Sequence, residues 1–147
     1  MDIREQLRDT LHSEIPLTRA IGIDVDNYSG DCLTLRAPLQ PNTNHKDTAF
    51  GGSLYSVAVL SGWGLIHLKL KELDRPAHIV IQHSKVDYIR PVTDDITSVC
   101  CFESEQQVQR CLKMYASKGR ARIDLHAIIR QGEDDAVLFF GRYVIHR

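Results

Sequence analysis

The sequence predicts a single α+β domain in which an antiparallel sheet wraps around one long central helix. From Gly51 to His67 there is no Asp, Glu, Lys or Arg, and apolar residues fall on every side of the helix that this segment would form. A helix that is apolar all round is buried all round. Residues 78–146 instead largely alternate apolar and polar side chains, as antiparallel strands with one covered face do. The central helix is the only cover apolar enough for that face, which gives the α+β class.

Length and composition fit one globular domain spanning residues 1–147. Hydrophobic residues make up 43% of the chain and charged residues 25%, and the net charge of −1 comes from interspersed signs. Neither a nucleic-acid surface nor an acidic tail is expected from such a pattern. The charged N-terminus lacks the apolar core of a secretory signal, and Ser and Gly residues make the central segment a poor membrane span. We therefore expect a cytoplasmic protein that does not insert into a membrane.

The first third of the chain predicts a short helix and an extended segment. Apolar residues at helical spacing predict an amphipathic helix from Asp2 to about Ser13, which ends at Ile15-Pro16. Residues 23–37 predict either one long bent strand or a hairpin, because Gly30-Asp31 interrupts their alternation.

After the central helix the pattern predicts four strands arranged as a meander, with a helical insert between the second and third. The strands are expected at residues 78–90, 96–103, 120–130 and 136–146, and the insert at residues 105–118. Such a sheet leaves unpaired edges, so we expect a homodimer with a continuous sheet, or a dimer of dimers.

The cysteines and histidines predict neither disulfides nor a metal site. Cys32, Cys100, Cys101 and Cys111 form no CxxC pair and are expected to be small core residues in a reducing compartment. The seven histidines show no HxxxH or HExxH spacing.

The start of the central helix is the candidate site. A polar loop from Asn44 to Thr48 leads into Phe50-Gly51-Gly52-Ser53. Unpaired N–H groups at a helix N-terminus attract negative charge, and glycines expose those donors because they carry no Cβ. The alternative is a turn eased by glycine, with Thr48 or Ser53 capping the helix.

These residues resemble the PaaI-type acyl-CoA thioesterases of the hot-dog fold, in which a sheet of about five strands wraps a long helix. That family carries an Asn, five intervening residues and His-Gly-Gly, followed by a carboxylate nine residues after the His. Asn44 and Phe50-Gly51-Gly52 stand in the same frame, and Tyr88-Ile89-Arg90-Pro91 resembles a strand end of these enzymes. The pattern of the thioesterase domain of the YiiD C-terminal type is similar to Asn44-His45, Thr48-Ala49-Phe50-Gly51-Gly52-Ser53-Leu54 and Gly62-Trp63-Gly64 of this chain.

The resemblance implies thioester hydrolysis, but two family positions differ. Phe50 replaces the family's His, and Val59 stands where its catalytic carboxylate should be. The Gly51 and Gly52 N–H groups could still stabilise an oxyanion, and Asn44 could orient the carbonyl or the water. The first substitute for the missing base is His45, because imidazoles titrate near neutral pH, and the second is Asp47.

Other residues are expected to contact the substrate. Phe50 could shape an acyl pocket, with Thr48 and Ser53 beside it, and Ser53 is more typical of a hydrogen-bonding role than of a nucleophile. The resemblance to hot-dog dimers implies that the strand of His83 runs near the partner's helix start; the alternative is a half-exposed strand histidine without a role in the site. Lys118, Arg120 and Arg122 could hold the phosphates of coenzyme A. The alternative for these three is a solvated strand face.

The function predicted from the sequence is hydrolysis of an acyl-CoA or acyl-carrier-protein thioester. It needs no cofactor, because coenzyme A is part of the substrate. The alternative is a non-catalytic acyl-thioester-binding module that assists an acyltransferase. A dehydratase of the hot-dog class would need a His and a carboxylate paired across the dimer, and no convincing Glu lies near the central helix.

Overall fold

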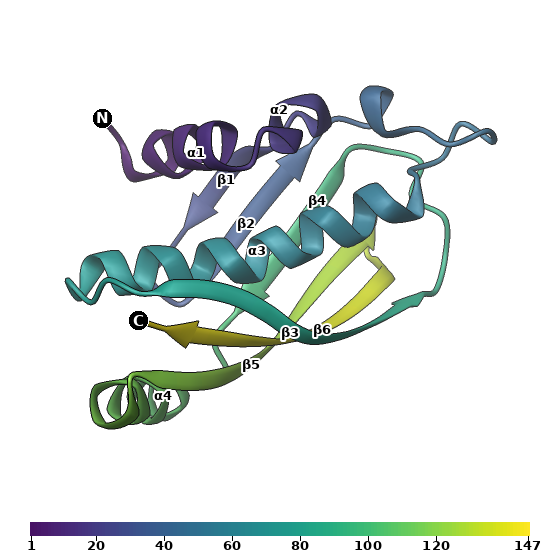
Figure 1. Cartoon of the computed structure of the whole chain (residues 1–147). Coiled ribbons are helices and arrows are strands. Elements are labelled where there is room, and N and C mark those ends of the chain that lie inside the picture. Colours follow the sequence, from purple (N-terminus) through teal and green to yellow (C-terminus); the bar gives the residue numbers. More distant parts are fainter.

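The computed structural model describes all residues from 1 to 147 and contains one six-stranded antiparallel sheet in the order β1-β2-β4-β5-β6-β3. Figure 1 shows the long helix α3 lying across one face of this sheet, with α1 beside it and α4 next to β5 at the lower left of the view. In chain order the elements are α1 (Ile3–Glu14), α2 (Leu17–Ile21), β1 (Asp24–Tyr28), β2 (Cys32–Ala37), the 3-10 helix η1 (Gln40–Asn42), α3 (Gly51–Glu72), β3 (His78–Tyr88), β4 (Ile96–Cys101), α4 (Glu105–Lys118), β5 (Arg120–Gln131) and β6 (Asp134–His146).

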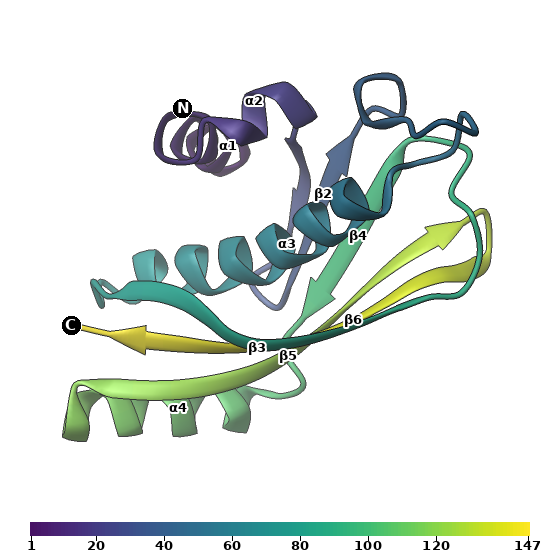
Figure 2. The same cartoon turned by 45° about the vertical axis from the view of Figure 1, so that its right-hand side comes forward.

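The core lies between α3 and the face of the sheet that curves around it, as the turned view in Figure 2 makes clear. Two glycines of α3 let the sheet approach its backbone. A Cβ at Gly62 would stand 2.2 Å from the hydroxyl of Tyr143, and one at Gly64 would stand 2.7 Å from Leu33. In that space the Tyr143 hydroxyl donates a 2.6 Å hydrogen bond to the Val59 carbonyl. Small helical residues therefore let the helix pack closely against the sheet at these two positions.

The helix α1 covers a second side of α3 and begins where its sequence predicts. The Asp2 side chain accepts from the Arg4 N–H and so caps the first turn. Leu7 and Leu11, one turn apart, are fully buried. The short helix α2 that follows was not expected, and it ends at Gly22, whose φ of 78° is the left-handed conformation that glycine adopts readily.

The insert α4 closes an edge that β4 leaves open. Residues Ser98 to Cys101 of β4 pair with Ile129 to His126, so the first half of β5 has no strand beside it on that edge. There α4 lies along β5, and the Gln107 side chain donates a 2.6 Å hydrogen bond to the Asp124 carbonyl. An amphipathic helix therefore covers this edge of β5, where a further strand would otherwise pair.

Residues 23–37 form the hairpin, one of the two alternatives that the sequence predicted, so the sheet has six strands. One topological expectation from the sequence was wrong. β3 does not lie beside β4 in a meander but pairs with β6 at the far edge of the sheet. Periodicity reveals that a segment is a strand, but only long-range pairing decides which neighbour it takes.

The expected state of the cysteines was also partly wrong. Cys32 and Cys101 face each other across β2 and β4 and form a disulfide, whereas Cys100 and Cys111 are free and buried as predicted. The register between the two strands selects Cys101 over its neighbour, and sequence spacing cannot show a register. Burial raises the pKa of the Cys100 thiol to about 12 and that of Cys111 to about 11, so both stay protonated at neutral pH.

One stripe of α3 is not covered within the chain, although the sequence predicted burial on all sides. Ser56, Val59, Trp63 and His67, spaced three or four residues apart, are only half-buried. A single sheet and one short helix cover the other sides. None of the helices combines the length and hydrophobicity that crossing a bilayer requires.

We expect the Gly62→Ala variant to lose about 1–3 kcal/mol in the free energy of unfolding, because the added methyl group overlaps the Tyr143 ring, which is held by the core. Denaturant titration measures this. Gly52→Ala is the matched control, since its methyl group meets only the exposed Phe50 ring, and its change should stay within about 0.5 kcal/mol. If the two variants have the same free energy of unfolding, the Tyr143 ring can move aside without loss of stability, which would contradict the prediction.

Candidate functional site

The N-terminus of α3 presents unpaired backbone donors. Phe50 is the extended N-cap residue, and no side chain caps the helix. The Phe50 carbonyl accepts from the N–H groups of Ser53 and Leu54, whereas those of Gly51 and Gly52 have no acceptor. Neither Thr48 nor Ser53 caps the helix, so two donors at the positive end of the helix dipole face outward.

The loop that leads to this helix is anchored at its base by a residue that the sequence reading missed. Asn42 is only 3% exposed, and its amide donates to the carbonyls of Ile21 and Pro38 at 2.8 and 2.7 Å. Its own carbonyl accepts from the Phe50 N–H at 2.7 Å. Asn42 therefore ties the helix start to α2 and to the end of β2. In the sequence, the only sign of this anchoring role is the position of Asn42 beside Pro41 and the candidate loop.

Asn44 holds the shape of the loop. Its side-chain oxygen accepts from the N–H groups of Lys46 and Thr48, and its amide donates to the Thr48 hydroxyl at 2.8 Å. The tip between them, with His45 and Asp47, is exposed and projects beyond the sheet (Figure 1). Asp47 adopts a φ of 61°. Asn44 and Thr48 thus bond to each other and position the loop, while His45 and Asp47 face solvent within one chain.

Two aromatic rings flank the free donors. The Tyr88 hydroxyl donates to the Gly51 carbonyl at 2.9 Å, and its ring lies 3.6 Å from where a Gly51 Cβ would be. The Phe50 ring lies over Gly52 from the other side. Both rings remain about half exposed, at 56% for Phe50 and 51% for Tyr88. Burial raises the pKa of the Tyr88 phenol, which therefore stays protonated at neutral pH.

The position where the resemblance places a carboxylate holds no acid. Val59 is half-buried on the uncovered stripe of α3, and the helix has no Asp or Glu before Glu72. The titratable side chain on this stripe is His67, which the sequence reading did not single out. It stacks on Trp63 with ring centroids 4.9 Å apart, and burial lowers the pKa of its imidazole. The spacing of Trp63 and His67 by four residues was a signal for this stack.

His83 does not lie at the helix start of its own chain. Ser84 bonds Tyr55 of α3, so its neighbour His83 points to the other face of the sheet, which we call the outer face. There it lies 6.2 Å from the Phe140 ring, which also contacts His126.

The basic cluster lies at the opposite end of the sheet. Arg120 pairs with His146, and His146 pairs with His78, the first residue of β3. Tyr88, the last residue of β3, contacts Gly51. The eleven residues of β3 separate the two places, a length of about 33 Å. The structure therefore brings together Asn44, Thr48, Phe50, Gly51, Gly52 and Ser53, and it places Lys118, Arg120 and Arg122 elsewhere.

This arrangement suits stabilisation of a negative charge that develops between two aromatic walls. Backbone donors at a helix start act on an oxyanion without reorganising. Nowhere do three His, Cys, Asp or Glu side chains gather in a geometry that could hold a metal ion.

Comparison with known proteins finds the family described as "Putative thioesterase (yiiD_Cterm)", whose model matches residues 4–147. A protein of unknown function from Chlorobaculum tepidum is 33% identical, with a TM-score of 0.93 over 99% of this chain and 94% of its own. A protein from Shewanella oneidensis that is described as a "putative thioesterase" is 27% identical, with a TM-score of 0.85 over 98% of this chain and 97% of its own. The E. coli PaaI protein is 17% identical, with a TM-score of 0.64 over 98% and 92%, and shares the fold.

We expect Gly52→Val to weaken binding of a non-hydrolysable acyl-CoA analogue at least tenfold while changing stability little. The branched side chain would stand over the free donors and displace only the exposed Phe50 ring. Calorimetric titration measures the affinity and thermal unfolding the stability, with Gly52→Ala as an intermediate step. Undiminished affinity in the valine variant would remove the helix start as the site.

Proposed function

The chain belongs to the YiiD C-terminal thioesterase family and has the hot-dog fold, and from this premise we propose that it hydrolyses acyl thioesters at the N-terminus of α3. The observation that carries the proposal is the pair of unpaired N–H groups at Gly51 and Gly52. The substrate class is an acyl group on coenzyme A or on an acyl carrier protein.

In the proposed reaction a water molecule attacks the thioester carbonyl carbon, whose oxygen gains negative charge. The Gly51 and Gly52 N–H groups donate to that oxygen, and one such donor contributes about 3–4 kcal/mol in other enzymes. A base takes the proton of the water, the carbon–sulfur bond breaks, and the thiolate receives a proton. The acyl chain lies against the Phe50 ring, which is exposed for contact.

We propose His45 as the base, with Asp47 as the second candidate. The hydrogen bonds of Asn44 to Lys46 and Thr48 fix the backbone around His45, so its imidazole starts from an ordered loop. Asn44 acts as a positioning residue, because its side-chain groups are already bonded within the loop.

The proposed active form is a homodimer joined along β3. This strand is eleven residues long, and its outer edge has no neighbour. Val80, Ile81, Tyr88 and Ile89 are exposed on or just after it, and the uncovered stripe of α3 lies on the same side. The other edge strand, β1, is only five residues long and exposes Asp24 and Asp26, which discourages pairing. A partner along β3 would cover both apolar surfaces at once.

A second function is favoured by one observation. Val59 leaves α3 without a carboxylate facing that interface, so the fold could bind an acyl thioester and release it unchanged. Such a binding module would assist an acyltransferase.

We expect His45→Ala to lower kcat by about 10²–10⁴-fold, the effect typical of removing a general base. The wild-type rate should fall at acid pH, because a protonated imidazole cannot accept the proton of water. Release of free thiol from a panel of acyl-CoA substrates measures both. Asn44→Ala should lower the rate without moving the pH profile, since an amide does not titrate. An unchanged rate in folded His45→Ala protein would transfer the role to Asp47 or to a partner residue.

We expect sedimentation to give a mass of twice 16.7 kDa at micromolar concentration. Ile81→Glu should shift the protein toward monomer, because it places a charge on the open edge of β3. Leu17→Glu is the control, since Leu17 is also an exposed apolar residue, at 61% against 37% for Ile81, but lies on α2. A monomeric wild-type protein, or equal behaviour of the two variants, would contradict the β3 interface.

A further inference from the structure

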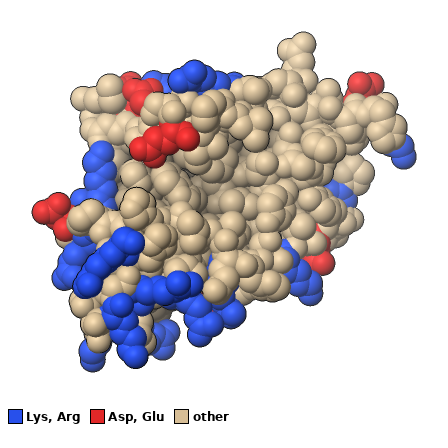
Figure 3. Space-filling model, viewed as in Figure 1, with Lys and Arg blue, Asp and Glu red and all other residues tan.

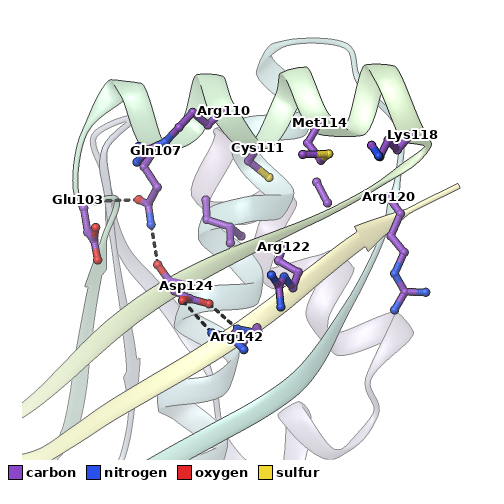
Figure 4. A pocket seen from close by; sticks show the side chains of 12 residues that line it. Glu103, Gln107, Arg110, Cys111, Met114, Lys118, Arg120, Arg122, Asp124 and Arg142 are labelled. Carbon is purple, nitrogen blue, oxygen red and sulfur yellow. Dashed lines mark hydrogen bonds and ion pairs between the residues drawn. The ribbon is translucent and has the colours of Figure 1, made fainter.

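A groove separate from the helix start runs between α4 and the first half of β5. It has a volume of about 780 Å³. Figure 4 shows Cys111 and Met114 pointing from α4 toward β5, with Arg122 on the strand across from them. The groove exists because α4, and not a strand, covers this edge of β5.

Cations dominate the lining of this groove in a chain whose net charge is −1. Five Arg and Lys side chains and two carboxylates line it. Asp124 is already bonded by Arg142 at 2.9 Å. Glu103 faces His126, 4.0 Å away. Figure 3 shows the same bias, because Lys and Arg gather around α4 while the middle of that face carries no charge.

Four cations of the groove take part in no ion pair or side-chain hydrogen bond: Arg110, Lys118, Arg120 and Arg122. By contrast, seven other Lys and Arg residues of the chain pair with Asp or Glu side chains. Like charges that gather without counter-charges repel one another, so an anion between them would be favoured.

The volume and the lining of the groove indicate which class of anion it could bind. Its volume falls within the range of about 300–1,000 Å³ that is typical of small-molecule sites. Met114 on α4 is exposed and adds an apolar side chain beside the cations, which suits a flat aromatic base next to phosphate groups.

We infer that the α4/β5 groove binds a phosphorylated nucleotide, with Lys118, Arg120 and Arg122 holding its phosphates and Met114 lying against its base. Arginine forks and the lysine ammonium both bind phosphate through charge-assisted hydrogen bonds. The nucleotide is either the end of a coenzyme A molecule or a free nucleotide. This binding does not depend on the proposed hydrolysis, because the groove lies at the opposite end of β3 from Gly51 of the same chain.

Calorimetric titration of the full-length protein tests the inference with ADP, adenosine 3′,5′-bisphosphate, coenzyme A and pantetheine. We expect the three nucleotides to bind, more weakly as salt rises, and pantetheine not to bind in the groove. Arg122→Glu and Lys118→Glu should each lower nucleotide affinity at least tenfold, as expected for losing a charge-assisted hydrogen bond. Lys113→Glu makes the same charge change on α4 but lies outside this groove, so it should change affinity less than threefold.

The same variants separate the two sources of the nucleotide. If coenzyme A occupies the groove, adenosine 3′,5′-bisphosphate competes with it, and Arg122→Glu raises KM for acyl-CoA without lowering kcat. If a free nucleotide occupies it, ADP binds while the affinity for coenzyme A stays the same in Arg122→Glu. The inference is overturned if no nucleotide binds at millimolar concentration. It is also overturned if all three variants behave alike, or if an acidic carrier protein binds here without competition from nucleotides.

Discussion

The contact between α3 and the concave face of the sheet is the constraint on which the rest of the structure depends. The helix carries the apolar surface that the strands need, and Gly62 lets the Tyr143 hydroxyl reach the Val59 carbonyl. The Ser61 hydroxyl lies 3.0 Å from that of Ser98, so even the buried polar groups of this interface bond each other. Because the helix is fixed along its length, its first turn has a fixed place at the rim of the sheet.

The candidate site follows from that placement. α3 begins at two glycines that nothing caps, so the free donors that most helix starts satisfy with a side chain stay open here. Asn42 anchors the preceding loop, and Tyr88 of β3 fixes the Gly51 carbonyl from the other side. The site is therefore held by buried or bonded groups, although the donors themselves face outward.

A sheet has two faces and two edges, and one chain of this size covers only part of them. α1 and α4 cover a side of α3 and an edge of β5, whereas β3 and the stripe around Val59 and Trp63 remain open. The α4 insert leaves the basic groove on the outer side as a consequence of covering an edge with a helix. The surface proposed for a second copy lies where the edge of β3 has no neighbouring strand. The surface proposed for a nucleotide lies where a helix, α4, covers the edge of β5.

The sequence by itself determined the local features, because they depend on neighbouring residues. Uncharged residues from Gly51 onward fixed the central helix, alternation fixed β5, and the Asn44 to Gly52 segment located the candidate site. Only the tertiary structure decided what depends on distant pairing. The register of β2 against β4 joined Cys32 to Cys101, and the packing of Ser84 against Tyr55 put His83 on the outer face. The pairing of β3 and β5 with β6 put the basic residues at the opposite end of β3 from Gly51. No periodicity encodes such choices, because they are made by burial and hydrogen bonding between segments far apart in the chain.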